Sequence, residues 1–181
     1  MIERDEQELA TRAKDGDTKA FETLVRRYER VIFNLALRMT HDREDARDIA
    51  QVVFVKAYQG LSGFDPKYRF FSWIYRIGVN ESLNHRGRTR QHEELSDTLT
   101  SDDRDADQRA EEVRVGGAIE DSLMQLSVDY RTVIILRHFL ELSQAEMAQV
   151  LEVPEKTVKS RLHTARQNLA ALLGRKGITH V

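Results

Sequence analysis

Two helices and a tight turn are predicted by one segment of this 181-residue sequence, Ser143-Gln-Ala-Glu-Met-Ala-Gln-Val-Leu-Glu-Val-Pro-Glu-Lys-Thr-Val-Lys-Ser-Arg-Leu-His-Thr-Ala-Arg166. Ser143 and Glu146 have the spacing of a capping box, in which each side chain binds the backbone N–H of the other residue at the start of a helix. Pro154 suits the first turn of the second helix, where its missing N–H costs nothing. A helix, a three-residue turn over 152–154 and a second helix make up a helix-turn-helix. In DNA-binding proteins the second helix of this motif lies in the major groove.

The second helix of this segment has an apolar side and a basic side. Val158, Leu162 and Ala165 recur at helical spacing and are expected to face a core. The opposite side carries residue types that pair with phosphates or read base edges. They are Lys156, Ser160 and His163 near its centre, flanked by Lys159, Arg161, Thr164 and Arg166. The pattern favours DNA reading, although a plain helical bundle with a solvated basic face has the same pattern.

The rest of the chain divides into two helical blocks with an acidic stretch between them. Apolar spacing in the second block predicts helices over 116–126, 128–141, 144–151 and 155–173. Residues 93–112 contain nine acidic and two basic side chains and few large apolar ones. Such a composition does not bury enough surface to offset its ordering entropy, so a flexible acidic linker is predicted over 93–115. The expected fold is all-α, with two small helical domains, 1–92 and 116–176, on a tether.

Polar helix caps and turns organise the first block. Asp17 can cap a helix whose apolar positions run from Phe21 to Met39 at helical spacing. Asp42 can cap the next helix, which is expected to end near Gly60. An aromatic-rich helix is predicted to follow Pro66. The first domain is therefore also expected to be helical throughout.

Six of the thirteen aromatic residues of the chain lie within twelve positions. They are Phe64, Tyr68, Phe70, Phe71, Trp73 and Tyr75, and Lys67, Arg69 and Arg76 lie between or beside them. Aromatic rings next to cations suit single-stranded DNA, because exposed bases stack on rings while cations follow the phosphates. A hydrophobic core is the other explanation, and for this cluster taken alone it is the better one.

A third segment, 45–58, predicts an amphipathic helix with a polar face. Asp48 and Gln51 lie one turn apart on that face. A face of this kind can dock a partner helix. A solvated face without a partner is the more common reason for such residues, and both interpretations stay open at this point.

Catalytic and metal-binding patterns are missing from the sequence. It contains no cysteine, no phosphate-binding glycine loop and no metal-ligand spacing among its six histidines. An enzyme is therefore not expected, and no cofactor or metal is predicted. The first residues do not resemble a signal peptide, and the longest apolar runs are too short to cross a membrane. A cytoplasmic protein without membrane insertion is expected.

Taken together, these segments resemble the extracytoplasmic-function (ECF) group of bacterial RNA polymerase sigma factors over nearly the whole chain. The similar segments are Gly16 to Tyr28, Asp48 to Tyr58, Phe71 to Asn80 and Thr157 to Arg166. The second of them resembles the segment that binds the polymerase clamp, and the third resembles the promoter-melting segment. The fourth resembles the helix that reads the −35 promoter element.

The resemblance implies a dissociable subunit that binds core RNA polymerase and directs it to promoters, in a stress or envelope response. It implies a sigma2-like first domain, a sigma4-like second domain, contacts with the β′ clamp and the β flap, and control by an anti-sigma factor. The residues implied to bind core polymerase are Asp48, Gln51 and Phe54. Those implied to bind the −10 element are Lys56, Phe64, Trp73, Tyr75, Arg76 and Asn80, and a loop over 60–68 is implied to hold an extruded base. At the −35 element the resemblance adds Thr157 to the residues named above.

Three positions depart from the family pattern. Val52 stands where an acid usually follows the clamp-segment glutamine, and Ser127 stands where many members have proline. Glu152 occupies the turn where many have glycine, so this residue has to accept or avoid a left-handed backbone. Two alternatives stay open: a two-domain regulator whose first half is a sensor, and a helical adaptor that binds only proteins.

Overall fold

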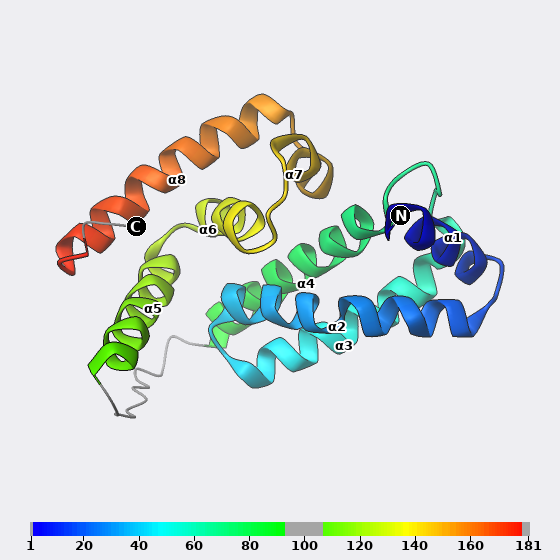
Figure 1. The fold of residues 1–181 in the computed structure, drawn as a ribbon, viewed down its shortest axis with the longest axis horizontal. Coiled ribbons are helices and arrows are strands. Elements are labelled where there is room, and N and C mark those ends of the chain that lie inside the picture. The colour runs from blue at the N-terminus through cyan, green and yellow to red at the C-terminus, as the bar shows by residue number, and fades with distance from the viewer. Residues whose placement is uncertain (1, 93–106, 179–181) are drawn as a thin grey trace.

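The computed structural model describes residues 2–92 and 107–178, with side chains over 5–85 and 114–178, and all regular structure in these ranges is helical. The first block contains α1 (Ile2–Lys14), α2 (Thr18–Thr40), α3 (Arg43–Gly60), the 3₁₀ turn η1 (Leu61–Gly63) and α4 (Phe70–His92). The second contains α5 (Asp107–Gln125), α6 (Val128–Ile134), the π-helical turn η3 (Ile135–Phe139), α7 (Gln144–Leu151) and α8 (Glu155–Arg175). The prediction of an all-α fold with two helical domains is confirmed (Figure 1).

The second block begins earlier than the sequence pattern predicts. α5 starts at Asp107, so residues 107–115 belong to a helix and not to the linker. This part of the chain has no proline and carries acidic residues at the start of the helix, where the helix dipole favours negative charge. The remainder of the predicted linker, residues 93–106, lies outside the described residues.

Side-chain caps set the helix boundaries of the first block. Asp17 accepts hydrogen bonds from two backbone N–H groups in the first turn of α2, at 3.0 and 3.1 Å. Asp42 does the same for α3, at 2.8 and 2.9 Å. Between these two helices His41 adopts a left-handed conformation, with φ of 64°, and ends α2. Both predicted N-caps are confirmed.

The helix-turn-helix segment forms as predicted, with one strained position. Ser143 and Glu146 make a capping box, in which the Ser143 N–H donates to the Glu146 carboxylate at 2.8 Å. Glu152 ends α7 with φ of 53° and ψ of 40°, so it accepts the left-handed conformation that glycine usually takes. This conformation costs a non-glycine residue about 1–2 kcal/mol. Pro154 stands at the N-cap of α8, one residue before the first turn.

Helix α1 lies before Gly16, where the sequence pattern predicts no particular element. Leu9, Ala10 and Ala13 are its buried apolar residues, and they recur at helical spacing. They belong to the same hydrophobic core as α2, α3 and α4. The pattern is short and built largely from alanine, which is why it gives a weak signal in the sequence.

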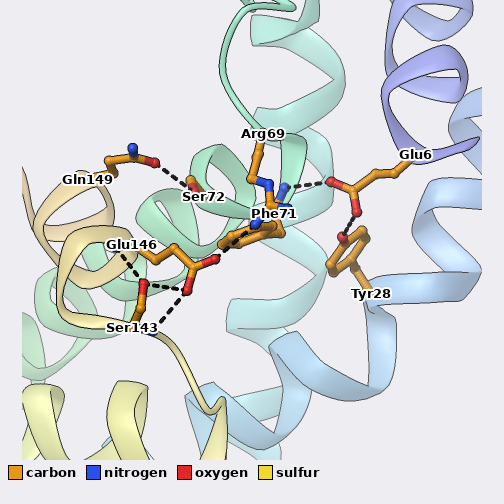
Figure 2. A network of polar contacts seen from close by, with 8 residues as sticks. All are labelled: Glu6, Tyr28, Arg69, Phe71, Ser72, Ser143, Glu146 and Gln149. Atoms are coloured by element: carbon orange, nitrogen blue, oxygen red, sulfur yellow. Dashed lines mark hydrogen bonds and ion pairs between the residues drawn. The ribbon is translucent and has the colours of Figure 1, made fainter. Parts of the chain in front are cut away.

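Helices α4 and α7 bring the two blocks together, and the hydrophobic core is continuous across them. Figure 1 shows α7 between α8 and α4. The polar contacts at this junction are Arg69–Glu146 at 2.9 Å, Arg76–Glu152 at 2.6 Å and Ser72–Gln149 at 3.4 Å, of which Figure 2 shows the first and the third. Partly exposed ion pairs contribute about 0–1 kcal/mol each. The two ion pairs, Arg69–Glu146 and Arg76–Glu152, can therefore exchange for other partners at a small cost in free energy.

Candidate nucleic-acid interface

The outer face of α8 presents the side chains that were predicted to read DNA. Lys156, Lys159, Ser160, His163 and Arg166 are exposed, and Thr157, Arg161 and Thr164 are half-buried. The opposite face packs into the core through Val158, Leu162 and Ala165, each at most 2% exposed. The predicted orientation of this helix is confirmed. Three cations, a hydroxyl and an imidazole thus share one exposed surface, as a groove-reading helix needs.

Two of the predicted phosphate contacts have partners within the protein. An Nη atom of Arg161 lies 3.0 Å from a carboxylate oxygen of Asp129 on α6. The Nε–H of Arg166 donates to Nε2 of His138 at 3.4 Å. Burial, followed by the charges of nearby arginines, lowers the pKa of His138 below its ordinary value, so its imidazole is neutral at pH 7 and can accept this bond. Both arginines therefore also attach α8 to the elements behind it.

Most of the aromatic cluster lies in the core of the first block. Phe64, Phe70 and Tyr75 are 2%, 0% and 8% exposed. The ring of Phe64 packs against Phe70 and Trp73, with centroid distances of 5.7 and 5.2 Å. Burial, with a smaller effect of the Glu6 charge, raises the pKa of Tyr75 to about 12. The structure thus places both rings in the core, which is the reading favoured for the cluster taken alone, because a domain this small needs such rings in its core. Their predicted contact with the −10 element stays a prediction.

The other residues predicted for the −10 element reach the surface of α3 and α4. Asn80 is exposed and Trp73 is half-buried. Lys56 on α3 donates to the carboxylate of Glu81 at 2.6 Å, and Glu81 directly follows Asn80 on the neighbouring helix. Arg76 lies one turn before Asn80 on α4 and forms the ion pair with Glu152 of the second block described above. The structure therefore pairs Lys56 with the residue that follows Asn80, and it pairs Arg76, one turn before Asn80, with the second block.

One exposed ring in this region was not singled out as a site residue. Tyr68 is 59% exposed and lies in the loop that leads into α4. The sequence signal for it is its neighbour Lys67 and its position two residues before the first buried ring of the helix. An exposed ring beside a cation is what a single-stranded base stacks on.

An open groove of about 680 Å³ lies between helices α2 and α3. Gln51 and Phe54, two of the three residues predicted to bind core polymerase, line it. Asp48 is exposed one turn before Gln51 and lies outside the lining residues. Phe33 and Arg30 of α2 also line the groove and were not predicted, because their role depends on how the two helices pack. A groove with apolar walls and polar edges suits a partner helix.

The surface of α3 beside this groove is unusually apolar. Val52 and Val55 are 41% and 54% exposed. Val52 is the residue that departs from the family pattern by replacing an acid. Exposed apolar side chains next to a groove are typical of a protein-binding surface. The departure thus puts an exposed apolar side chain on this face where the family usually has an acid.

The described residues contain no group of three or more histidine or acidic side chains that could hold a metal ion. Over residues 2–92 and 107–178, no helix has the length and apolar character needed to cross a membrane.

Two protein families match this chain in separate parts. Sigma-70 region 2 matches residues 24–92, and Sigma-70 region 4 matches residues 116–169. The first match contains α3, the loop before α4 and α4 itself, and the second contains the helix-turn-helix. Together they cover each surface described above.

Curated relatives are similar over almost their whole length. The chain is 32% identical over 179 residues to the RNA polymerase sigma-H factor of Pseudomonas aeruginosa, covering 92% of this chain and 93% of that one. It is 33% identical over 174 residues to the ECF RNA polymerase sigma-E factor of Haemophilus influenzae, covering 90% and 92%. It is 35% identical over 174 residues to the ECF sigma factor SigM of Mycobacterium tuberculosis, covering 95% and 86%.

Solved structures give the same result. The structure of CnrH in complex with the cytosolic domain of CnrY superimposes with a TM-score of 0.74 at 31% identity, covering 94% of this chain and 98% of that chain. The sigma factor RpoE of Bartonella quintana, in complex with the anti-sigma factor NepR, has the same fold, with a TM-score of 0.69, 23% identity and coverage of 86% and 98%. The chain belongs to the ECF group of RNA polymerase sigma factors, and its function is promoter-specific transcription initiation.

Proposed function

We propose that this sigma factor reads the −35 element with α8, reads the −10 element with the α3–α4 surface and binds core polymerase through the α2–α3 groove. The observation that carries the proposal is the outer face of α8. Its basic and polar side chains are exposed directly opposite a stripe that is at most 2% exposed. A helix whose inner face is packed against the core and whose outer face is polar can enter a major groove without rearrangement.

At the −35 element, the position of each side chain on α8 suggests its role. Ser160 and His163 lie at the centre of the exposed face and are proposed to contact base edges. Lys156, Lys159 and Arg166 are proposed to pair with phosphates, which fixes the register of the helix in the groove. The half-buried residues Thr157, Arg161 and Thr164 are proposed to border the same contact.

At the −10 element, Asn80, Lys56 and Trp73 are proposed to contact the melted strand, with the loop 60–68 receiving an extruded base. Opening a duplex requires a pocket for the extruded base and surfaces on which the strand can stack. The exposed ring of Tyr68 adds a stacking surface at the edge of this loop. Phe64 and Tyr75 are proposed to support these contacts from the core and not to touch the DNA in this conformation.

The ion pair between Arg76 and Glu152 affects how the α3–α4 surface becomes available to DNA. Arg76 is proposed to contact a phosphate of the −10 strand, and in this structure its Nη1 lies 2.6 Å from the Glu152 carboxylate. A phosphate is an equally good partner for a guanidinium, and a half-exposed pair contributes about 0–1 kcal/mol. Exchange of Glu152 for DNA is therefore inexpensive, and it is accompanied by separation of α4 from α7.

The expected partners follow from the same surfaces. Core RNA polymerase is proposed to dock its β′ clamp on the α2–α3 groove and its β flap on the second domain. An anti-sigma factor is proposed as the inhibitor of this chain, since RpoE is bound to the anti-sigma factor NepR in its structure, and CnrH is bound to the cytosolic domain of CnrY. A cytoplasmic location and a stress or envelope response complete the proposal.

Polymerase affinity is expected to depend on the exposed polar side of the groove. The double variant Asp48→Ala/Gln51→Ala is expected to bind core polymerase about tenfold more weakly, the loss typical of removing an interface contact worth more than 1 kcal/mol. Both side chains are exposed, so the helix content and the unfolding midpoint should not change. Binding is measured by titrating labelled core polymerase with each variant.

Gln59→Ala is the matched control for this prediction. Gln59 is an exposed amide two turns further along α3 and does not line the groove. Its replacement should leave polymerase affinity at the wild-type value. If the double variant and the Gln59 variant bind equally well, the polymerase-binding surface lies elsewhere on the molecule.

A further inference from the structure

Two side chains of α1 hold the loop that joins η1 to α4. The side-chain amide of Gln7 donates to the backbone carbonyl of Pro66, and to that of Tyr68 at 3.2 Å. The ammonium group of Lys14 donates to the carbonyl of Phe64 at 2.7 Å. The carbonyl groups of three alternate loop residues, 64, 66 and 68, thus accept hydrogen bonds from one helix.

A third side chain of α1 fixes the point where this loop becomes helical. Glu6 is 8% exposed, and one of its carboxylate oxygens accepts a hydrogen bond from the N–H of Phe71 at 3.1 Å. The other oxygen accepts from the hydroxyl of Tyr28 at 2.6 Å, as Figure 2 shows. Phe71 is the second residue of α4, where backbone N–H groups have no partner within the helix. A carboxylate at this position satisfies one of them and is favoured by the helix dipole.

The hydrogen bonds that form within the loop itself are all short-range. The N–H groups of Lys67 and Tyr68 bond to the side chain and the carbonyl of Asp65, each at 3.0 Å. Asp65, Lys67 and Tyr68 are all exposed. A short exposed loop with local bonds alone samples several conformations. The ring of Phe64 anchors the start of the loop in the core, and the bonds from α1 hold the exposed part of the backbone over 65–68 on one path.

We propose that α1 is a strap that positions the −10 loop, with Gln7 and Lys14 as positioning residues and Glu6 as the anchor of the α4 start. The inference rests on the proposed role of the loop 60–68 in receiving an extruded base. The Sigma-70 region 2 match begins at residue 24, so α1 precedes the matched segment and its contacts are read from this structure alone. The strap determines how selectively the −10 base is read, and it does not determine how tightly polymerase is bound.

The physical reason is that reading a base requires donors and acceptors to be held in place. Misplacement of a contact by about 1 Å is enough to remove most of its benefit. A loop released from Gln7 or Lys14 can still be occupied by any base, because stacking does not depend on sequence. Selectivity at the extruded position should then fall by about tenfold, the value of one good base contact.

The test uses the full chain with core RNA polymerase and promoter duplexes in which the −10 bases are permuted one at a time. Gln7→Met and Lys14→Met remove each donor while keeping the length of the side chain. Lys14→Arg restores a donor, and Lys19→Met, at an exposed position early in α2, repeats the charge change away from the loop. The readouts are the ratio of open complexes on preferred and permuted promoters, the polymerase affinity, and backbone hydrogen exchange over 64–71.

If α1 acts as a strap, both methionine variants should exchange backbone amide hydrogens faster over 64–71. Their ratio of open complexes on preferred and permuted promoters should fall about tenfold, and their polymerase affinity should not change. Lys14→Arg and Lys19→Met should behave as the wild type. Unchanged exchange overturns the strap, and faster exchange with an unchanged ratio overturns its role in reading. If the wild-type protein opens promoters without any preference at the −10 positions, the proposed role of the loop itself is refuted, whatever the exchange rates show.

Discussion

Replacing Arg131 with alanine is expected to lower the free energy of unfolding by at least about 3 kcal/mol, because several buried carbonyl groups lose a charged donor at once. Arg131 is 1% exposed although it carries a charge. Its guanidinium donates to the carbonyls of Leu123, Met124 and Leu126 at 2.8, 2.5 and 3.3 Å. It also donates to the carbonyl of Met39 at 2.9 Å.

These four acceptors explain why a cation is stable inside this core. Three of them lie in or just after the last turn of α5, and Met39 lies in the last turn of α2. Carbonyls at helix C-termini have no partner within the helix and carry the negative end of the helix dipole. Arg131 therefore satisfies two helix ends together, and one of them belongs to the other block of the protein.

Chemical denaturation of the full chain measures this effect. Arg137→Ala is the control, because Arg137 is exposed and makes one hydrogen bond, to the carbonyl of Leu142 at 2.9 Å. Its replacement should cost about 1 kcal/mol. Arg131→Lys keeps the charge but has a single donor head that cannot reach all four carbonyls, so it should lie between alanine and the wild type. A loss of less than about 1 kcal/mol for Arg131→Ala would show that water replaces the guanidinium, and the account of this core would be wrong.

Substitutions on α8 are expected to divide into two classes when the holoenzyme binds promoters. Ser160→Ala and His163→Ala should reduce discrimination at single −35 positions by about 1–3 kcal/mol per lost base contact. Their effect on the salt dependence of binding should be small. Lys159→Ala and Arg166→Ala should weaken all promoters alike and lower the slope of log affinity against log salt by about 0.9 per lost phosphate contact.

The two classes follow from the position of each side chain on the helix. Ser160 and His163 lie at the centre of the exposed face, while Lys159 and Arg166 lie toward the phosphate walls of a groove. Arg161 is not a clean probe, because it is 3.0 Å from Asp129 and its loss also affects packing against α6. Affinities are measured with the polymerase holoenzyme at several salt concentrations. If all four variants change affinity and salt slope in the same way, α8 enters the groove with a different face.

Local features of this fold could be predicted from the sequence because a few neighbouring residues determine them. The aspartate caps of α2 and α3 and the capping box of α7 are examples, and all three form at the predicted residues. The inner stripe of α8 was also predicted correctly, since helical spacing alone defines it.

Features that depend on packing between distant segments were not predictable in the same way. Arg69 and Glu146 are 77 positions apart, and no periodic pattern indicates that they pair. Phe64 was predicted as a DNA contact from the family resemblance, and its packing against Phe70 in the core could not be read from its own position in the loop. Arg131 stands at the start of an apolar run and has no sequence feature that marks it as buried. Which side of an aromatic or charged residue meets water is decided by the tertiary fold.

Transcription from a randomised template shows whether two separate surfaces of this chain read two promoter elements. Core RNA polymerase and the full chain transcribe a DNA library in which the −35 and −10 positions vary, and the transcribed templates are sequenced. Enrichment of defined bases in two separated blocks is expected, and only when the chain is present. Ser160→Ala should alter the first block alone, and Asn80→Ala the second block alone. Transcripts without sequence enrichment, or variants that both change the same block, would contradict this expectation.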